Sequence, residues 1–362
     1  MPAHACDLVL LSWNQLECTR PCVESILANT GLPCRLIIVD QNSDAETRAY
    51  LRGLRSTPRV TVELLFNPTN VGYPAGMNLG LRRAAAPYVC FLNNDILVPP
   101  GWLEELIRVA ESGPSVGLVN PSSNTFGILP PAGTGWKELA RRCGGHRGEW
   151  IEVRYGEGFC LLGRRDLLLT VGGFDETTYE QIYFEDADLG RKIQAQGFRC
   201  VMALGTYVWH EGGQTMATRP DRLRLFQENE RRFHQRWPRG KRVLIALKNG
   251  SRHLAEAAGE EARSEANRSG EVWIVAQPAL RADLPRHLSI RILSCPAWQI
   301  PGRALLKAIT KKKKFDRIVT DSAALRLALK GTAFLHRAAV EPIRSTQSTG
   351  RSPYGDPPEW PT

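Results

Sequence analysis

The chain has 362 residues, 43% of them hydrophobic, which predicts about two domains, each with a real core. No apolar run approaches the roughly 20 residues of a membrane span, and the stretch up to Arg20 lacks the basic and long apolar regions of a signal peptide. The net charge of +10 is uneven, because residues 1–240 hold 26 basic and 26 acidic side chains whereas 241–362 hold 21 and 11. A basic region of this kind can attract nucleic acid or an anionic membrane, or can simply be a solvated surface.

Strands and helices alternate along the first part of the chain. In chain order, the pattern predicts a strand at 7–12, a helix at 18–30, a strand at 34–43, a helix at 44–56, a strand at 60–67, a helix at 75–86, a strand at 87–95 and a helix at 101–112. The strands are continuously apolar, which is typical of a mostly parallel sheet with helices on both faces.

From about residue 113 the pattern loosens into loops rich in Gly, Pro, Ser and Asn. Further along, we expect a strand, a short helix and a Gly-Gly turn within 152–176, a helix from Asp186 to Gln196, a strand ending at His210 and a basic helix at 222–237. The predicted division is a first domain at 1–240, a linker at 241–270, a small α/β region at 271–341 and a disordered tail at 342–362. Within the predicted linker, residues 250–270 are polar and small and indicate either a linker or an exposed helix.

Nine cysteines are scattered along the chain without any CxxC pair. This spacing favours free buried thiols in a reducing compartment over disulfides or a zinc site.

Three predicted strands end in polar clusters: Ser12-Trp13-Asn14, Asp40-Gln41-Asn42-Ser43 and Asn93-Asn94-Asp95. The carboxyl ends of parallel strands meet at one edge of a sheet, where ligands of such folds bind. The three clusters therefore predict a polar ligand that crosses this edge.

Asp95 and His210 are candidate metal ligands. A carboxylate at a strand end can hold Mg²⁺ or Mn²⁺ together with substrate phosphates, and an imidazole also suits Mn²⁺. The alternatives are a loop-capping Asp and a structural His.

The run Glu185-Asp186-Ala187-Asp188 places three acids at a predicted helix start. They can cap the helix, or one of them can take a proton from an attacking hydroxyl group. The Gly- and Asn-rich stretch FNPTNVGYPAGMNLGL before another helix lets backbone N–H groups approach phosphate or sugar, but it fits neither a P-loop nor the GxGxxG pattern of NAD-binding proteins.

Taken in order, these segments resemble the family 2 glycosyltransferases, an inverting group with a GT-A fold, and in particular rhamnosyltransferase-like members. The matching pieces span about residues 6–216 and are LLSWN, LIIVDQNSDAET, NPTNVGYPAGMNLGL, FLNNDILVPPGWLEEL, GFCLLGRRDLLLTVGGFDE, YFEDADLGRKIQAQGFR and VWHEGGQT. The resemblance implies an α/β GT-A domain with a mostly parallel, helix-flanked sheet, followed by a C-terminal α/β extension.

The resemblance also implies roles for individual residues. Asp40 would contact the nucleobase, with Asp44 nearby, and the remaining positions expected to bind the nucleotide-sugar are Ser12, Asn14, Asn42, Ser43, Asn70, Gly72, Asn78, Asn93 and Asn94. The family's DXD motif falls on Asn93-Asn94-Asp95, with Asn in place of the first Asp, and Asp95 and His210 would bind the metal. Asp186 of the pair Glu185-Asp186 would be the base, with Asp188 as the fallback, and Gly158 and Phe159 would shape the acceptor site.

The expected activity is inverting transfer of a sugar from a UDP- or dTDP-sugar to a glycan or lipid-linked glycan, with Mg²⁺ or Mn²⁺, in bacterial surface polysaccharide synthesis. The expected location is the cytoplasm or the inner face of the membrane, with no nucleic acid as partner. The sequence leaves three roles open for the basic C-terminal region: a peripheral membrane contact, an acceptor-recognition module, or part of a second, incomplete transferase-like domain. The alternative is a non-catalytic nucleotide-sugar-binding protein with a decayed site, which the Asn at position 93 favours.

Overall fold

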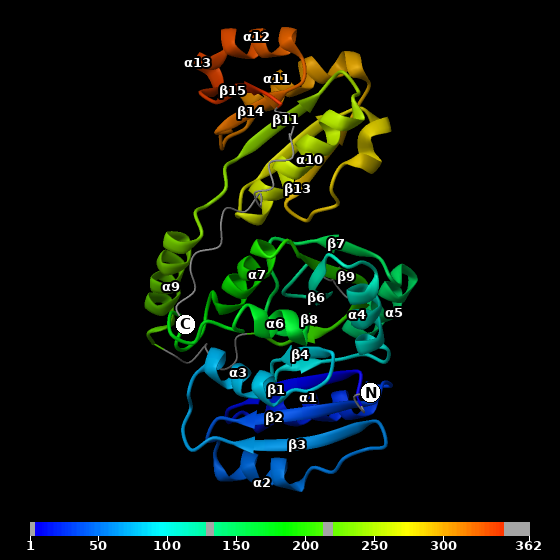
Figure 1. Ribbon diagram of the computed structural model, residues 1–362, viewed down its shortest axis with the longest axis vertical. Coiled ribbons are helices and arrows are strands. Elements are labelled where there is room, and N and C mark those ends of the chain that lie inside the picture. The colour runs from blue at the N-terminus through cyan, green and yellow to red at the C-terminus, as the bar shows by residue number, and fades with distance from the viewer. Residues whose placement is uncertain (1–3, 128–133, 213–219, 344–362) are drawn as a thin grey trace. The chain divides into compact units, whose positions relative to one another are not determined.

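The computed structural model describes residues 4–127, 134–212 and 220–343. These residues belong to two compact units (Figure 1). The first consists of Met1–Ile151 with Tyr155–Arg236, and the second of Glu152–Arg154 with Trp237–Thr362. None of the helices within the described ranges combines the length and the apolar character needed to span a bilayer.

The first unit is built on an eight-stranded sheet with the order β3-β2-β1-β4-β8-β6-β9-β7. The strands are β1 (Cys6–Ser12), β2 (Cys34–Asp40), β3 (Val60–Phe66), β4 (Tyr88–Leu92), β6 (Val116–Ser122), β7 (Trp150–Glu152), β8 (Cys160–Arg164) and β9 (Arg199–Tyr207). The pairs β1–β2, β1–β4, β2–β3 and β6–β9 are parallel. A separate antiparallel pair joins β5 (Ile96–Leu97) to β10 (Trp209–His210).

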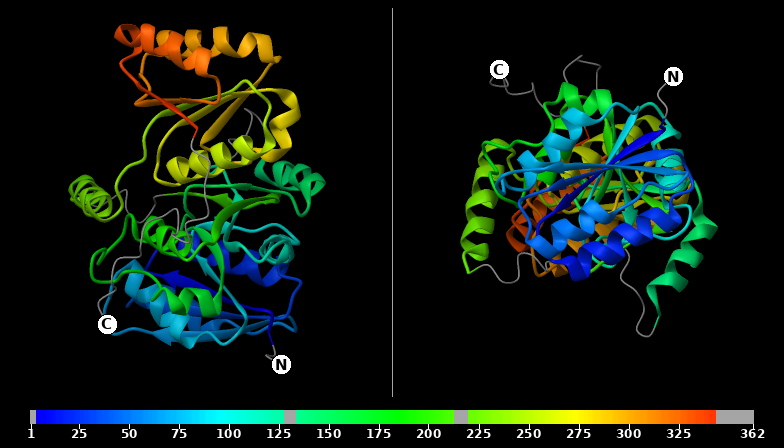
Figure 2. Two further views of the ribbon diagram at one scale, coloured as in Figure 1. Left: turned by 45° about the horizontal axis from the view of Figure 1, so that its top comes forward. Right: turned by 90° about the horizontal axis from the view of Figure 1, so that it is seen from below.

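Helices lie on both sides of this sheet (Figure 2). They are α1 (Leu16–Asn29), α2 (Ala45–Gly53), α3 (Tyr73–Arg83), α4 (Trp102–Glu111), α5 (Trp136–Cys143), α6 (Arg165–Thr170), α7 (Glu185–Ala195) and α9 (Arg222–Arg236), with a short 3₁₀ helix η1 (Gly144–His146). The expectation of a mostly parallel sheet flanked by helices is therefore confirmed.

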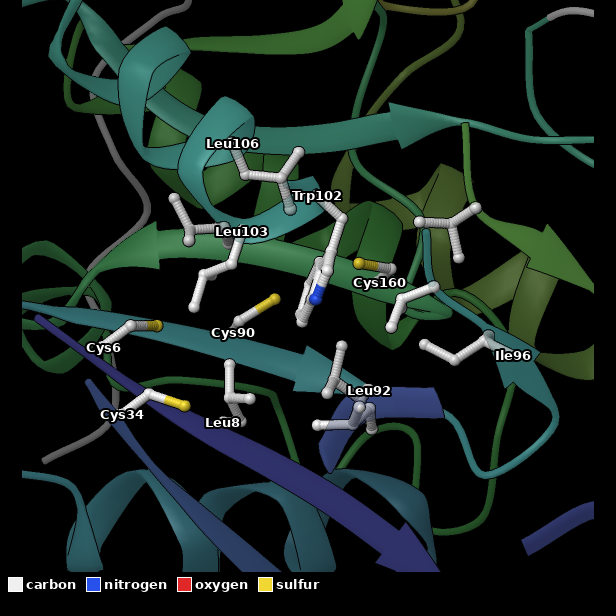
Figure 3. Packing of buried hydrophobic residues seen from close by; sticks show 14 of the residues in the cluster. Cys6, Leu8, Cys34, Cys90, Leu92, Ile96, Trp102, Leu103, Leu106 and Cys160 are labelled. Atoms are coloured by element: carbon white, nitrogen blue, oxygen red, sulfur yellow. The ribbon is translucent and has the colours of Figure 1, made fainter. Parts of the chain in front are cut away.

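Successive side chains of β1 point to opposite faces of the sheet, and different helices pack on the two faces. Leu8 and Leu10 belong to the core cluster that includes residues of α1 and α4 (Figure 3). Val9 points to the other face, where a Cβ added to Gly80 of α3 would lie 2.2 Å from its Cγ1 atom. A glycine at position 80 thus lets α3 approach the sheet closely. All nine cysteines are free thiols, and all except Cys18 are buried.

Two features of the first unit were not specified by the sequence pattern. Strand β8 runs antiparallel to β4 and β6, which makes the mostly parallel sheet a mixed one. Strand β6 also lies where the sequence predicts loops. Its sequence, VGLVNPS, contains Gly, Asn and Pro, which weaken the strand signal even though every residue of the strand is buried.

The second unit is a five-stranded parallel sheet with the order β13-β12-β11-β14-β15. Its strands are β11 (Val243–Leu247), β12 (Val272–Ala276), β13 (Ile290–Ser294), β14 (Arg317–Thr320) and β15 (Ala339–Pro342). Its helices are α10 (Arg252–Asn267), α11 (Ile300–Thr310), α12 (Ala323–Gly331) and α13 (Ala333–His336), with 3₁₀ helices η2 (Pro278–Asp283) and η3 (Ala297–Gln299).

The prediction of a linker at 241–270 is wrong. This segment contains β11, the central strand of the second sheet, and α10, whose alanines pack into the core. The alternative interpretation of 250–270 as a helix agrees with α10, but this helix has a buried face, which Ala255, Ala258, Ala262 and Ala266 form. Of the predicted tail at 342–362, only the first two residues fall within the described part, and Pro342 ends β15.

Candidate active site

The polar clusters after β1, β2 and β4 lie at one edge of the first sheet, as predicted. Ser12 pairs with Asp40 across β1 and β2, and Leu10 pairs with Leu92 across β1 and β4, so the three parallel strands end side by side. A cavity of about 540 Å³ opens at this edge. The predicted site residues that line it are Asn70, Gly72, Asn93, Asn94, Asp95, Gly158, Phe159, Glu185, Asp186 and His210.

The pairing of β5 with β10 brings His210 to Asp95 although 115 positions separate them. Ile96 lies opposite His210 in this ladder, and the N–H of Glu211 donates to the carbonyl oxygen of Asp95 at 3.0 Å. His210 Nε2 then lies 3.3 Å from Asp95 Oδ1. Asn124 holds the backbone of His210 from the other side, with bonds of 2.7 and 2.9 Å.

The other ring nitrogen of His210, Nδ1, lies 2.9 Å from Thr125 Oγ1. If Nδ1 carries the proton and donates to this hydroxyl group, the lone pair of Nε2 faces the side of Asp95. A second contact of this kind is what orients a metal-binding histidine. The imidazole also stacks on Phe159, with ring centroids 5.0 Å apart and 15° between the planes.

Asp95 and His210 fit a divalent cation that keeps several ligands from water or substrate. Asp95 Oδ1 is buried and accepts no hydrogen bond from the described residues, as expected of an oxygen reserved for a ligand. Within the described ranges no group of three His, Cys, Asp or Glu side chains could enclose a metal. The donor set thus suits Mg²⁺ or Mn²⁺ bound mainly through phosphate oxygens, rather than a closed structural site.

Asp186 is held by two backbone N–H groups at the start of α7. Its Oδ2 accepts from Gly158 at 3.0 Å and its Oδ1 accepts from Ala187 at 2.7 Å. Burial raises the pKa of the Asp186 carboxyl above its ordinary value, and these two hydrogen bonds offset part of the rise. Gly158 is fixed in turn, because Tyr73 donates from its hydroxyl group to the Gly158 carbonyl oxygen at 2.9 Å.

Glu185 is the second acid at the cavity. Its side chain is buried, and its Oε2 atom has no hydrogen-bond partner among the described residues. Burial, and then the neighbouring charge of Asp186, raise the pKa of Glu185 well above its ordinary value. Of the two carboxyl groups, Asp186 is the one whose anionic form is stabilised by two backbone N–H donors, whereas burial and the charge of Asp186 disfavour the anion of Glu185.

The turn that delivers these acids is strained. Tyr183 and Phe184 have φ angles of 78° and 72°, a left-handed conformation that residues with large side chains rarely adopt. Two such residues in sequence cost on the order of 1–3 kcal/mol each. They place Glu185 and Asp186 in the first turn of α7, where the helix dipole favours negative charge.

Several residues expected to contact the nucleotide do not line the cavity and have partners within the fold. Asp40 is 1% exposed, and its Oδ2 accepts from Arg48 Nε at 2.8 Å. Ser43 Oγ accepts from the N–H of Asn14, whose own Oδ1 accepts from the N–H of Asp44 at 2.8 Å. These side chains connect the turns after β1 and β2. The predicted residues that do not line the cavity at this edge are Ser12, Asn14, Asp40, Asn42 and Ser43.

Asn78 and Asp188 also have structural positions instead of the expected ones. The amide of Asn78 donates to the carbonyl oxygen of Phe174 and accepts from its N–H, at 2.9 and 3.0 Å. Asp188 is fully buried and lies 3.3 Å from both Lys192 Nζ and Arg236 Nη1. Because neither residue lines the cavity, the expectation of Asp188 as a fallback base is not retained.

The sequence reasoning missed part of the cavity wall. The additional lining residues are Leu11, Trp13, Gln41, Tyr73, Tyr155, Glu157, Gln181, Ile182, Tyr183, Phe184, Ala187 and Phe226. Trp13 and Gln41 belong to the polar clusters that were found, so their positions gave a signal. Phe226 on α9 gave none, because an aromatic residue on a basic helix looks like an ordinary packing residue.

Residues 7–172 match the family model described as glycosyl transferase family 2. Over these residues, the resemblance carried by the motifs is thus confirmed. The match includes the cavity residues from Leu11 to Phe159, whereas Glu185, Asp186 and His210 lie beyond it.

Among curated relatives, the O-antigen biosynthesis protein RfbC of Myxococcus xanthus is 30% identical over 217 residues, which cover 53% of this chain and 16% of that protein. The uncharacterized protein y4gI of Sinorhizobium fredii is 24% identical, covering 64% of this chain and 27% of that protein. The chain thus spans a minor part of both. The N-acetylglucosaminyl-diphospho-decaprenol L-rhamnosyltransferase of Mycobacterium tuberculosis is 26% identical, covering 55% of this chain and 75% of that enzyme.

Solved structures resemble the chain more weakly. The mannosyltransferase PcManGT of Pyrobaculum calidifontis, in complex with GDP-Man and Mn²⁺, has a TM-score of 0.46 and 16% identity, covering 64% of this chain and 70% of that one. S. aureus TarS in complex with UDP-GlcNAc has a TM-score of 0.47 and 16% identity, covering 64% and 65%.

Proposed function

We propose that the chain is an inverting glycosyltransferase that moves a sugar from a nucleotide-diphosphate sugar to a hydroxyl group of a glycan or lipid-linked glycan. The observation that carries the proposal is that Asp95, His210 and Asp186, from distant parts of the chain, line one cavity. The family match and the relatives named for O-antigen biosynthesis and rhamnosyl transfer support a role in bacterial surface polysaccharide synthesis. A UDP- or dTDP-sugar as the donor is part of the same proposal.

Asp95 Oδ1 and His210 Nε2 would hold Mg²⁺ or Mn²⁺, since these two atoms lie 3.3 Å apart and the carboxylate oxygen is otherwise without a partner. When bound, the cation supplies positive charge that stabilises the departing nucleoside diphosphate. Thr125 and Phe159 keep the imidazole ring in place for this task.

Asp186 is the proposed base. Its carboxylate takes the proton from the acceptor hydroxyl group, which attacks the anomeric carbon from the face opposite the leaving group, so the configuration inverts. The raised pKa makes the carboxylate a better proton acceptor than an ordinary Asp. Gly158, fixed by Tyr73, orients the carboxylate beside the expected acceptor position at Phe159.

A donor screen with UDP-, GDP- and dTDP-sugars tests the activity, and two variants test the roles. Asp186→Asn should lower kcat by about 10²–10⁴ with donor affinity nearly unchanged. Asp95→Ala should weaken donor binding in the presence of Mn²⁺ but not in EDTA. Full turnover by Asp186→Asn would reject that residue as the base, and indifference of the enzyme to EDTA would reject the cation.

The second candidate is a non-catalytic nucleotide-sugar-binding protein. It is favoured by one observation, the Asn at position 93, whose amide Nδ2 lies 3.5 Å from His210 Nε2 where the family has a carboxylate. Donor binding measured by calorimetry, without transfer or donor hydrolysis for any acceptor tested, would favour this candidate over the enzyme.

A further inference from the structure

The second unit has large apolar side chains on its outer surface. Five of them lie on η3, α11, α12 and α13: Trp298, Leu306, Leu327, Phe334 and Leu335. Their exposed fractions are 77%, 62%, 71%, 76% and 41% in that order. Surface helices normally present polar residues to water, so these exposed apolar side chains indicate a contact surface. We call this set the apolar face.

The apolar face belongs to one layer of helices. Ala304 and Ala308 of α11 and Leu325 and Leu329 of α12 pack into the same core cluster on one side of the sheet. Leu306 and Leu327 each lie midway between two such buried positions, and a shift of two residues turns a helix by about 200°. Both leucines therefore point away from the sheet, and α11, α12 and α13 lie together in Figure 1.

The outer side of α12 is apolar almost throughout. Ala323, Ala324, Leu327 and Ala328 are all exposed, and Lys330 is the charged residue on this side. Phe334 of the adjoining α13 extends the same surface. The inner side of α12 already packs into the core through Leu325 and Leu329, so its apolar outer side is suited to an apolar partner.

Positive charge surrounds the apolar face. Residues 298–337 contain ten Lys and Arg side chains but only two acidic ones, Asp316 and Asp321. Both carboxylates are used within the fold, by the N–H groups of Arg242 and of Lys248 and Asn249. Lys312, Lys313 and Arg326 have no acidic side chain within ion-pair distance in the part of the chain that the structure describes.

Three further cations crowd around one ring at the start of this basic region. Lys307 Nζ and Lys311 Nζ lie 3.9 and 4.3 Å from the centroid of Trp273, and the Arg291 guanidinium lies 5.1 Å away. The carboxylate of Glu271, which accepts from Trp273 Nε1 at 2.9 Å, balances part of this charge, and an anionic partner would balance more of it. The layer of helices therefore combines exposed apolar area with an excess of positive charge.

We propose that the apolar face and the lysines at 311–314 bind the second unit to an anionic lipid bilayer, with Trp298, Leu327 and Phe334 inserted at the headgroup boundary. Apolar insertion and attraction to anionic headgroups together give stable but reversible binding. This interaction does not depend on the proposed transfer reaction. A second copy of the chain would match the apolar side chains but would bring the same positive charge.

Co-sedimentation of the full chain with vesicles tests the proposal. We expect binding to phosphatidylcholine vesicles containing 30% phosphatidylglycerol at 0.1 M NaCl, and at least tenfold weaker binding to phosphatidylcholine alone or at 0.5 M NaCl. Lys312→Gln with Lys313→Gln should weaken binding by about fivefold per lysine. The matched control, Arg59→Gln with Lys137→Gln, removes two exposed charges from the first unit and should change binding less than twofold.

Leu327→Ser with Phe334→Ser should lower the bound fraction at least tenfold, with an unchanged far-UV spectrum and unfolding midpoint because both side chains are exposed. The control is Leu169→Ser with Leu223→Ser, two exposed leucines of the first unit. Failure of the native chain to bind anionic vesicles, or full binding by the double serine variant, would overturn the proposal. So would a dimer in solution that the same variant dissociates, because the face would then be a contact between copies.

Discussion

Glu185 and Asp186 are neighbouring carboxyl groups whose pKa values are both raised, chiefly by burial. A buried acid with a raised pKa keeps a proton that the unfolded chain releases. Its contribution to stability is therefore complete below the unfolded pKa of about 4.3 and declines as the pH rises toward the folded pKa.

Glu185→Gln should remove the larger part of this loss of stability with rising pH, because Gln does not titrate. The difference in free energy of unfolding between the variant and the native chain should therefore shift in favour of the variant when the pH rises from 5 to 8. Urea unfolding at the two pH values measures this shift. An equal difference between variant and native chain at both pH values would mean that Glu185 titrates normally.

Gly72 lies at the cavity, before α3, with a φ angle of 85°. A Cβ atom at this position would lie 2.0 Å from the carbonyl oxygen of Glu180. We expect Gly72→Ala to cost about 1–3 kcal/mol of stability, because it combines a disfavoured conformation with a clash against backbone. Gly53→Ala is the control, since no atom lies within 4 Å of its added Cβ and the residue is helical, so thermal unfolding should show a small gain.

At the scale of elements, α7 presents Asp186 to the cavity, while Asp188 connects α7 to Arg236 of α9. Asp188→Ala leaves two cations near an empty buried site, so we expect a loss of about 3–5 kcal/mol in unfolding free energy. Asp166→Ala, at an exposed pair with Arg165, should cost less than about 0.5 kcal/mol. A stable but inactive Asp188→Ala would instead indicate a direct catalytic role.

Helix α9 contributes Phe226 to the cavity wall. Its ring packs 5.4 Å from that of Tyr183 and 5.2 Å from that of Phe184, centroid to centroid. If this wall holds the acceptor, Phe226→Ala should raise the acceptor KM about tenfold and leave the donor KM unchanged. Leu223→Ala, an exposed change on the same helix that does not line the cavity, should leave both constants unaffected.

The strands β1 to β4 could be predicted because each is a short apolar run, and parallel pairing then placed their polar ends at one edge. Strand β11 was missed although its sequence, VLIAL, is equally apolar, because it lies between a basic stretch and the polar sequence taken for a linker. The antiparallel insertion of β8 depends on pairing between distant segments, which periodicity does not encode.

The candidate site divides in the same way. Asp95 and His210 could be singled out because each directly follows an apolar strand, whereas the role of Asp186 comes from the family resemblance. The same resemblance placed Asp40 and Asn78 at the ligand, yet Arg48 and the backbone of Phe174 use their polar atoms. Such internal partners are visible only once the fold brings them together.

At the scale of the whole molecule, each unit has a core of its own. We therefore expect two calorimetric transitions. Ile274→Ala, in the buried core of the second unit, should destabilise one transition by about 2–5 kcal/mol and leave the other unchanged. Addition of UDP with Mn²⁺ should raise the midpoint of the other transition, that of the first unit, which Ile274→Ala does not affect. A single transition that both changes move would show that the units unfold together.

The left-handed conformation of Tyr183 and Phe184 implies that thermal stability and catalytic rate place opposite demands on this turn. Glycine at either position would relax the turn, so Tyr183→Gly should raise the melting temperature or leave it unchanged despite the lost ring. A more flexible turn would also hold the first turn of α7 less firmly. Asp186 would then be less well positioned, and proton removal from the acceptor would be slower. A search for heat-resistant variants would then select glycine at these two positions and yield poorer catalysts.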